Sequence, residues 1–116
     1  LLKTIFASKS GTSDQIEVLD IETYKKRIAE NDVQLVDVRT PREYKSGHLA
    51  KAVNIDFFHL GSFRTAFEKF DKEKPVYLYC RSGQRSMKAA KKLIGWGFTK
   101  VYDLEGGILN WQKNEK

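Results

Sequence analysis

Short apolar runs alternate with amphipathic stretches along most of this chain. The runs are nearly continuous, as in strands buried on both faces of a parallel sheet, and the stretches between them carry apolar residues at the spacing of one helix face. Strands are predicted at residues 16–19, 33–38, 52–55, 76–79 and 101–104. Helices are predicted after Asp20, from Pro41 to Gly47, over residues 60–70, from Ser86 to Trp96 and after Gly107. This repeated strand–helix order predicts an α/β domain in which helices cover both faces of a parallel sheet.

Cap residues mark the starts of two predicted helices. Asp20 is of a type that accepts hydrogen bonds from the first turn of a helix. The segment Thr40-Pro41-Arg42-Glu43 combines a Thr cap, a Pro at the first helical position and a Glu three residues after the cap. This is the capping-box pattern, so a helix is expected to begin there.

The chain is divided into an irregular arm, residues 1–15, and one folded domain, residues 16–116. Its 116 residues suit a single domain, and the arm is rich in Ser, Thr and Gly with few apolar anchors. The first residue is Leu1, so the native N-terminus is not seen, and residues 1–14 lack the apolar core of a complete signal peptide. They leave open the end of one, so we favour a cytoplasmic location and keep the periplasm as the alternative.

The net charge of +6 raises nucleic acid or an acidic membrane as partners. The lysines, however, are spread along the chain, and no aromatic-basic strip or nucleic-acid motif accompanies them. No apolar run reaches the roughly 20 residues that span a bilayer. We therefore expect a solvated basic surface, without a nucleic-acid or membrane partner, and a local attraction of small anions near Cys80.

Cys80 is the only cysteine, which excludes an internal disulfide, a CxxC redox pair and a cysteine-based zinc site. It ends the predicted strand 76–79 and precedes a loop that leads into a helix. Ligands of parallel sheets bind beyond the carboxyl ends of the strands, and the N–H groups of a helix start stabilise anions. This position predicts a reactive thiolate, whereas the alternative is a small buried side chain at the end of a strand.

The residues after Cys80 favour the reactive thiol. Two arginines beside a merely buried thiol would be costly to desolvate, whereas Arg81 and Arg85 can bind or steer an anionic donor. Gly83 permits a tight turn. Ser86 is expected to cap the helix and to donate a hydrogen bond to the sulfur.

Three segments of the chain, in order and at characteristic spacings, resemble the rhodanese domain family. They are Leu35-Val36-Asp37-Val38-Arg39 with Arg42-Glu43-Tyr44, Gly47-His48-Leu49 and Ala52-Val53-Asn54-Ile55; then Cys80-Arg81-Ser82-Gly83-Gln84-Arg85-Ser86; and finally Leu104-Glu105-Gly106-Gly107-Ile108 with Trp111. The resemblance runs from about Ile16 to Trp111. It implies a three-layer α/β fold around a central, mainly parallel five-stranded sheet.

The resemblance also implies an activity and its residues. A rhodanese moves a sulfane sulfur, typically from thiosulfate, through a persulfide on the cysteine to a thiophilic acceptor such as cyanide or a thiol. Cys80 would then be catalytic and residues 81–86 (Arg81, Ser82, Gly83, Gln84, Arg85 and Ser86) would bind the substrate. Asp37 and Arg42 would pair and brace the loop. No metal or organic cofactor is needed, and a monomer is expected because no helix carries a continuous exposed apolar stripe.

Other functions leave distinct marks in the sequence. Phosphatases of the related dual-specificity type need C-x5-R, whereas here the sixth residue after Cys80 is Ser86 and the arginine falls one position early. A sulfur-relay or binding module acting with a protein thiol stays open, since the lone cysteine requires an acceptor from outside. His48 is interpreted as a packing residue. Trp111 and the phenylalanines are expected in the core, with Phe57 or Phe58 at the site entrance.

Overall fold

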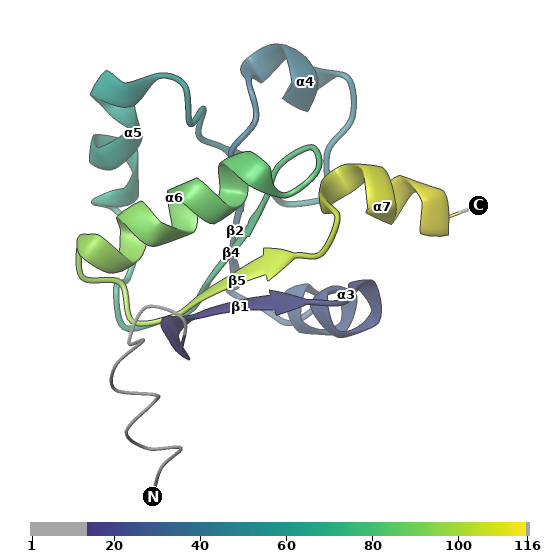
Figure 1. The fold of residues 1–116 in the computed structure, drawn as a ribbon, viewed down its shortest axis with the longest axis horizontal. Helices are drawn as coiled ribbons and strands as arrows, with labels where there is room; N and C mark the ends of the chain where they lie inside the picture. The colour runs from purple at the N-terminus through teal and green to yellow at the C-terminus, as the bar shows by residue number, and fades with distance from the viewer. Residues whose placement is uncertain (1–13, 116) are drawn as a thin grey trace, which may run out of the picture.

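The structure, a computed structural model, describes residues 14–115, in which strands and helices alternate (Figure 1). The elements are β1 (Ile16–Leu19), α3 (Ile21–Ile28), β2 (Gln34–Asp37), α4 (Pro41–Lys45), β3 (Val53–Asn54), α5 (Leu60–Phe67), β4 (Val76–Tyr79), α6 (Gln84–Gly95), β5 (Val101–Leu104) and α7 (Gly107–Asn114). Residues 1–13 of the predicted arm lie outside the described residues. Asp14 and Gln15, which the prediction assigned to the arm, bond to the domain: the Asp14 carbonyl accepts from Lys100, and the Gln15 amide donates to the Thr99 carbonyl.

The five strands form one sheet in the order β1-β5-β4-β2-β3, and every neighbouring pair is parallel. All five carboxyl ends therefore meet at one edge of the sheet. Strand β4 lies at the centre, with β5 on one side and β2 on the other, so the residue that follows β4 is surrounded by the ends of both neighbours. The predicted parallel sheet is confirmed.

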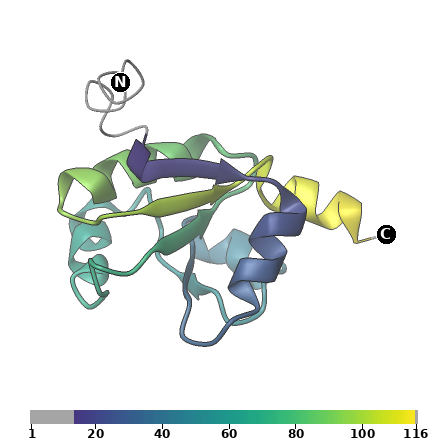
Figure 2. The ribbon, with the colours of Figure 1, turned by 90° about the horizontal axis from the view of Figure 1, so that it is seen from below.

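Helices cover both faces of this sheet (Figures 1 and 2). One core cluster joins α5 and α6 to the strands through side chains such as Phe63, Leu93 and Leu78. The other joins α3 and α7 through Tyr24, Trp111 and their neighbours. Apolar residues on both sides of each central strand explain why the strand sequences are continuous rather than alternating, and the predicted three-layer arrangement is confirmed.

The helix starts follow from their caps. The Asp20 carboxylate accepts from the Thr23 N–H at 2.8 Å. The Thr40 hydroxyl accepts from the Glu43 N–H at 3.3 Å, while the Glu43 carboxylate accepts from the Thr40 N–H at 3.0 Å, which completes the capping box. None of the helices between residues 14 and 115 combines the length and apolar character that a membrane span needs.

Several predicted boundaries differ from the structure: β2 and β3 are each one residue shorter at both ends than predicted, and α4 ends at Lys45 rather than at Gly47. Helix α5 ends at Phe67, three residues before the predicted end. Helix α6 begins at Gln84, two residues before the predicted start at Ser86, because Gly83 adopts φ 113° and serves as the N-cap. A residue with a side chain rarely adopts this φ, so the turn that ends at Gly83 fixes where the helix begins.

Candidate active site

Cys80 lies at the carboxyl end of the central strand β4, with only 1% of its surface exposed. Its Sγ accepts hydrogen bonds from two backbone N–H groups, those of Gly83 at 3.1 Å and Ser86 at 3.3 Å. The sulfur also lies 3.4 Å from the Ser86 hydroxyl oxygen. A thiolate or another anionic sulfur species at this point would be stabilised by these donors and by the N-terminus of α6.

Ser86 does not cap helix α6 as predicted, because Gly83 occupies the cap position. Ser86 is the third residue of the helix, and both its backbone N–H and its hydroxyl face the sulfur. Its hydroxyl donates to the Gly83 carbonyl at 3.3 Å. The residue therefore links the turn, the helix and the sulfur from a fully buried position.

The start of α7 forms the support behind the Cys80 loop. The Ile108 N–H donates to the Cys80 carbonyl at 2.9 Å, and the Leu109 N–H donates to the Arg81 carbonyl at 3.2 Å. Gly107 packs against the loop backbone so closely that a Cβ would lie 2.3 Å from the Arg81 carbonyl oxygen. Gly107, the first residue of α7, thus allows the start of this helix to contact the backbone of the Cys80 loop.

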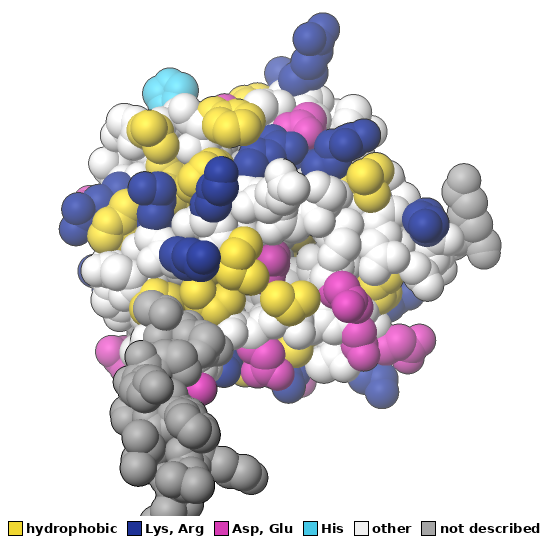
Figure 3. Space-filling model, in the orientation of Figure 1, with side chains coloured by type: hydrophobic (Ala, Val, Ile, Leu, Met, Phe, Trp, Pro, Cys, Tyr) yellow, Lys and Arg dark blue, Asp and Glu magenta, His cyan; other side chains and the backbone are white. Residues whose placement is uncertain are grey.

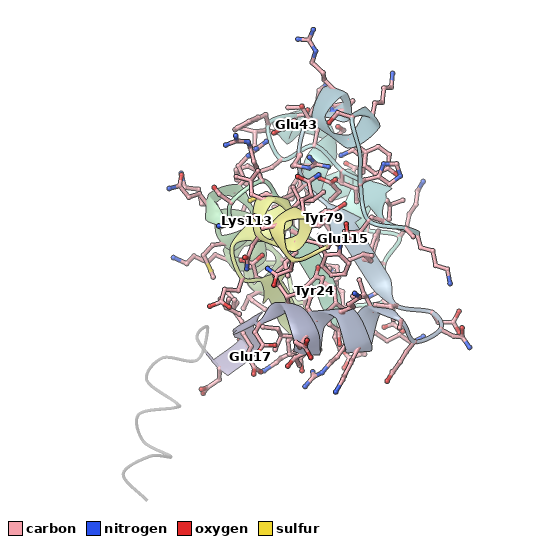
Figure 4. The ribbon with its side chains drawn as sticks, turned by 90° about the vertical axis from the view of Figure 1, so that its right-hand side faces the viewer. Glu17, Tyr24, Glu43, Tyr79, Lys113 and Glu115 are labelled. Carbon is pink, nitrogen blue, oxygen red and sulfur yellow. The ribbon has the colours of Figure 1, made fainter. Side chains whose placement is uncertain are left out.

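The two arginines of the loop differ in their environment. Arg85 forms a two-pronged ion pair with Glu43, with Nη1–Oε1 and Nη2–Oε2 distances of 2.7 and 2.9 Å. This guanidinium lowers the pKa of Glu43 to about 2, and the carboxylate in turn raises the pKa of Arg85. Figure 4 labels Glu43 on α4. Arg81, by contrast, is exposed and has no ion pair within the described part of the chain.

Glu43 was expected in a helix cap and in a segment that resembles the family, but not in contact with the Cys80 loop. Its carboxylate serves Thr40 and Arg85 at once, and the ring of Phe58 lies 5.3 Å from the Arg85 guanidinium carbon. Nothing in the capping-box pattern indicated the contact across 42 residues. The signal for this contact that the sequence did offer was an acidic residue close to the carboxyl edge of the predicted sheet.

The predicted pair of Asp37 with Arg42 is not formed. Asp37 is fully buried and pairs instead with Arg39, whose Nε and Nη2 reach its two carboxylate oxygens at 2.7 to 3.0 Å. Arg39 is the second residue after β2 and folds back onto Asp37, whereas Arg42 lies on the exposed side of α4. Nη2 of Arg39 also donates to the Gly47 carbonyl at 2.7 Å, so the pair braces the segment after β2.

The remaining predicted residues divide between rim and core. Ser82 and Gln84 are exposed on the loop. Phe57 is buried, as predicted. Phe58 is 63% exposed and lies outside the core, contrary to the prediction. His48 stacks on the Tyr44 ring at 3.6 Å between centroids, in agreement with a packing role. Trp111 is buried against α3 and the sheet, as expected.

The described residues offer no evident metal site. Between residues 14 and 115, no three His, Cys, Asp or Glu side chains lie close enough together to hold an ion. The polar groups that surround the Cys80 sulfur are backbone N–H groups and a hydroxyl, which suit an anion.

Most of the part of the chain that the structure describes matches known proteins. The family model described as rhodanese-like domain matches residues 20–114. The chain belongs to this family. The predicted family is therefore confirmed, and the support that α7 gives to the loop falls inside the matched range.

Curated relatives of this rhodanese-like domain include proteins named as sulfurtransferases. A "Sulfurtransferase" of Allochromatium vinosum is 36% identical over 100 residues, which cover 85% of this chain and 91% of that protein. A "Thiosulfate sulfurtransferase GlpE" of Coxiella burnetii is 38% identical over 91 residues, 78% of each protein. A "tRNA uridine(34) hydroxylase" of Pelagibacter ubique is 38% identical over 109 residues, and the match spans only 36% of its length.

Solved structures agree on the fold. The BH2092 protein of Bacillus halodurans superposes with a TM-score of 0.75 and 27% identity, covering 97% of this chain and 82% of that one. A rhodanese-related protein of Thermoplasma volcanium gives 0.72 and 26%, covering 84% and 92%. Both share the layered α/β arrangement, so the rhodanese-like domain is shown by sequence and by structure.

Proposed function

We propose that this rhodanese-like domain transfers a sulfane sulfur through a persulfide on Cys80. The observation that carries the proposal is the pair of backbone N–H groups, from Gly83 and Ser86, that donate to Sγ at 3.1 and 3.3 Å. Rigid donors of this kind stabilise developing negative charge without reorganisation during the reaction. A buried structural cysteine would gain nothing from such a cradle.

The transfer takes place in two half-reactions of covalent catalysis. The Cys80 thiolate attacks the outer sulfur of a donor such as thiosulfate. A new S–S bond forms, the S–S bond of the donor breaks, and sulfite leaves with the electron pair. An acceptor, cyanide or a thiolate, then attacks the outer sulfur of the persulfide and the Cys80 thiolate is restored.

In this proposal the donor is a small anion that carries a sulfane sulfur, and the acceptor is a small thiophile such as cyanide or a thiol. A basic chain and the exposed Arg81 favour an anionic donor. The acceptor comes from outside, because the chain has no second cysteine. The thiosulfate sulfurtransferase name of the Coxiella burnetii relative supports thiosulfate as the first donor to test. No cofactor takes part in either step.

Intact mass measured before and after incubation with thiosulfate tests the proposal. We expect the protein to gain the mass of one sulfur atom, cyanide to remove it, and Cys80→Ser to show no gain. A wild-type protein with a free thiol that gains no sulfur from thiosulfate or from a low-molecular-weight persulfide would overturn the proposal. Turnover of an aryl phosphate would instead point to a phosphatase.

A sulfur relay to a protein thiol is the second candidate. It is favoured by an exposed apolar side chain near the site, since Phe58 is 63% exposed and its ring lies beside Arg85. Apolar side chains exposed at the mouth of a site suit contact with a macromolecule. The mark of a relay would be faster transfer of the Cys80 sulfur to a protein thiol than to cyanide, lost in Phe58→Ser.

A further inference from the structure

The net positive charge of the chain is concentrated in the Cys80 loop and helix α6. Residues 81–95 hold five of the 21 Lys and Arg residues and none of the 15 Asp and Glu residues, so the rest of the chain, with 16 basic and 15 acidic residues, is close to neutral. Basic residues occur along the whole chain, but the longest stretch without an acidic residue, 74–102, contains this segment. The basic excess therefore lies beside the site.

The lysines of α6 lie along one exposed face of the helix. Lys88, Lys91 and Lys92 are exposed, whereas Ala89 and Ala90 between them are fully buried. Positions 88, 91 and 92 follow the i, i+3, i+4 spacing of one helix face, and Lys92 lies about 12 Å along the axis from the first residue of the helix. Figure 3 shows basic side chains gathered over α6, with hydrophobic side chains between them. A basic stripe thus leads from the Cys80 loop along the helix.

Four basic side chains of this surface are available to a partner, and together we call them the basic face: Arg81, Lys88, Lys91 and Lys92. None of them takes part in the three ion pairs that join described residues. Arg85, in contrast, is neutralised by Glu43. Like charges at i, i+4 on a helix repel each other, as Lys88 and Lys92 do. An acidic partner would remove this repulsion.

An open hollow of about 580 Å³ adjoins the basic face. Residues 82–84 of the loop line it together with Lys88 and Lys91, so it lies next to the N–H cradle of the sulfur. Val18, which is 49% exposed, and the half-buried Met87 give the hollow an apolar part. Exposed apolar surface rimmed by charged residues is typical of interaction sites, so the hollow offers apolar contact within reach of two lysines.

Two acidic residues restrict what can occupy the hollow. Asp103 is 3% exposed and its Oδ1 has no hydrogen-bond partner within residues 14–115, while Glu105 is exposed, and both line the hollow. A nucleic acid would bring a phosphate at every nucleotide against these carboxylates, and α6 has no aromatic residue on which bases could stack. A protein segment can instead set its carboxylates against the lysines and its apolar side chains into the hollow.

We propose that the basic face and the adjoining hollow form a docking surface for an acidic protein that presents a thiol to Cys80. The inference deepens the relay candidate and rests on the proposed persulfide for the transfer step alone. In that step the thiolate of the partner attacks the outer sulfur of the Cys80 persulfide. A new S–S bond forms on the partner, the S–S bond at Cys80 breaks, and its electron pair returns to the Cys80 sulfur. Charge complementarity speeds the encounter, and docking holds the two sulfurs in position.

Binding is tested in a Cys80→Ser protein, which cannot hold a persulfide, with a fluorescent peptide of Glu, Leu and one Cys. We expect fluorescence anisotropy to show binding that weakens with added salt, and a peptide with Gln in place of Glu to bind at least about tenfold more weakly. The double change Lys88→Gln and Lys91→Gln should weaken binding of the Glu peptide about three- to tenfold. Lys26→Gln with Lys74→Gln is the matched control, because it removes two exposed charges from α3 and from the amino edge of the sheet.

Equal binding of the Glu and Gln peptides would overturn the inference, and so would equal losses in the two double variants. Tighter binding of a single-stranded oligonucleotide, or of vesicles containing phosphatidylserine, through the same lysines would also overturn it, since the surface would then serve a nucleic acid or a membrane.

Transfer is a separate measurement. Wild-type protein loaded with sulfur should pass it to the Glu peptide faster than to the Gln peptide, and the change of Lys88 and Lys91 should reduce this preference about three- to tenfold. Transfer at the same rate to both peptides would contradict a docking surface that serves the relay. If the wild type cannot be loaded with sulfur, the proposed function fails, whereas the binding comparison still decides whether the basic face docks an acidic protein.

Discussion

Gly107 and Arg81 lie in backbone contact, so that a Cβ on Gly107 would stand 2.3 Å from the Arg81 carbonyl oxygen. Gly107 also has φ 65°, a region that side-chain-bearing residues rarely adopt. We expect Gly107→Ala to push α7 away from the Cys80 loop and to lower the free energy of unfolding by about 3 kcal/mol or more. Urea unfolding and sulfur loading from thiosulfate would measure both effects.

Gly61→Ala is the control for this change. Gly61 lies in α5 with no atom within 4 Å of the added Cβ, and Ala has the higher helix propensity, so we expect a gain of up to about 1 kcal/mol. If Gly107→Ala behaved like Gly61→Ala, the contact with Arg81 would not be a constraint on the loop.

The pairing of Asp37 with Arg39 leads to a second prediction. Asp37 is fully buried and Arg39 is 4% exposed, and removal of one partner leaves a buried charge without compensation. We expect Arg39→Ala to cost about 3–5 kcal/mol of unfolding free energy, whereas Arg42→Ala, on the exposed side of α4, should stay within about 0.5 kcal/mol of wild type. Thermal unfolding of the two variants at pH 7 distinguishes the observed pair from the one expected from the sequence, because equal losses would contradict the structure.

The comparison of these arginines shows what the sequence could predict here. Helix caps and buried strands follow from local patterns, and Asp20, Thr40 and strand β4 lie where those patterns placed them. The position of Cys80 at the end of a central strand followed from the repeated strand–helix order. Which of two nearby arginines reaches Asp37 depends on how the chain folds back after β2, which no local pattern contains.

Contacts between distant segments were missed for the same reason. Glu43 and Arg85 are 42 residues apart, and each already had a local role, in a helix cap and in a loop. The α6 start was also misplaced, because the φ of 113° at Gly83 arises from the turn around the sulfur. The register of β5 against β4, which brings Asp103 to the Cys80 face, is likewise a property of the assembled sheet.

The ion pair of Arg85 with Glu43 predicts how the site treats anions. Both terminal nitrogens of the Arg85 guanidinium bond to the Glu43 carboxylate. An anionic donor therefore meets an arginine whose charge is already neutralised. We expect Glu43→Gln, which keeps the shape of the helix cap, to lower the KM for thiosulfate by about three- to tenfold. Steady-state cyanide turnover at several thiosulfate concentrations measures this value.

Glu22→Gln makes the same charge change on the first turn of α3 and serves as the control. It should leave the KM unchanged. A Glu43→Gln protein with a raised KM and an unchanged fold would mean that the ion pair positions Arg85 for the donor rather than occupying it.

Two carboxyl groups give the stability of the fold opposite pH dependences. Arg85 lowers the pKa of Glu43 from 4.5 to about 2, so Glu43 stabilises the fold above pH 4.5 and this contribution is lost as the pH falls toward 2. Burial raises the pKa of Asp103 from 3.8 to about 6. As far as Asp103 is concerned, the free energy of unfolding is highest below pH 3.8. It falls as the pH rises through 6, because the folded protein must then hold an unpaired buried charge.

Asp103→Asn therefore should stabilise the protein at neutral pH and leave it unchanged in acid. A difference of about two pH units in pKa corresponds to at most about 3 kcal/mol, so we expect a gain of about 1–3 kcal/mol at pH 7.5 that shrinks toward zero at pH 4. Urea unfolding at the two pH values measures it. Glu105→Gln, with its exposed carboxyl, should show no such trend. A loss of stability in Asp103→Asn at pH 7.5 would mean that the carboxylate is paired in solution.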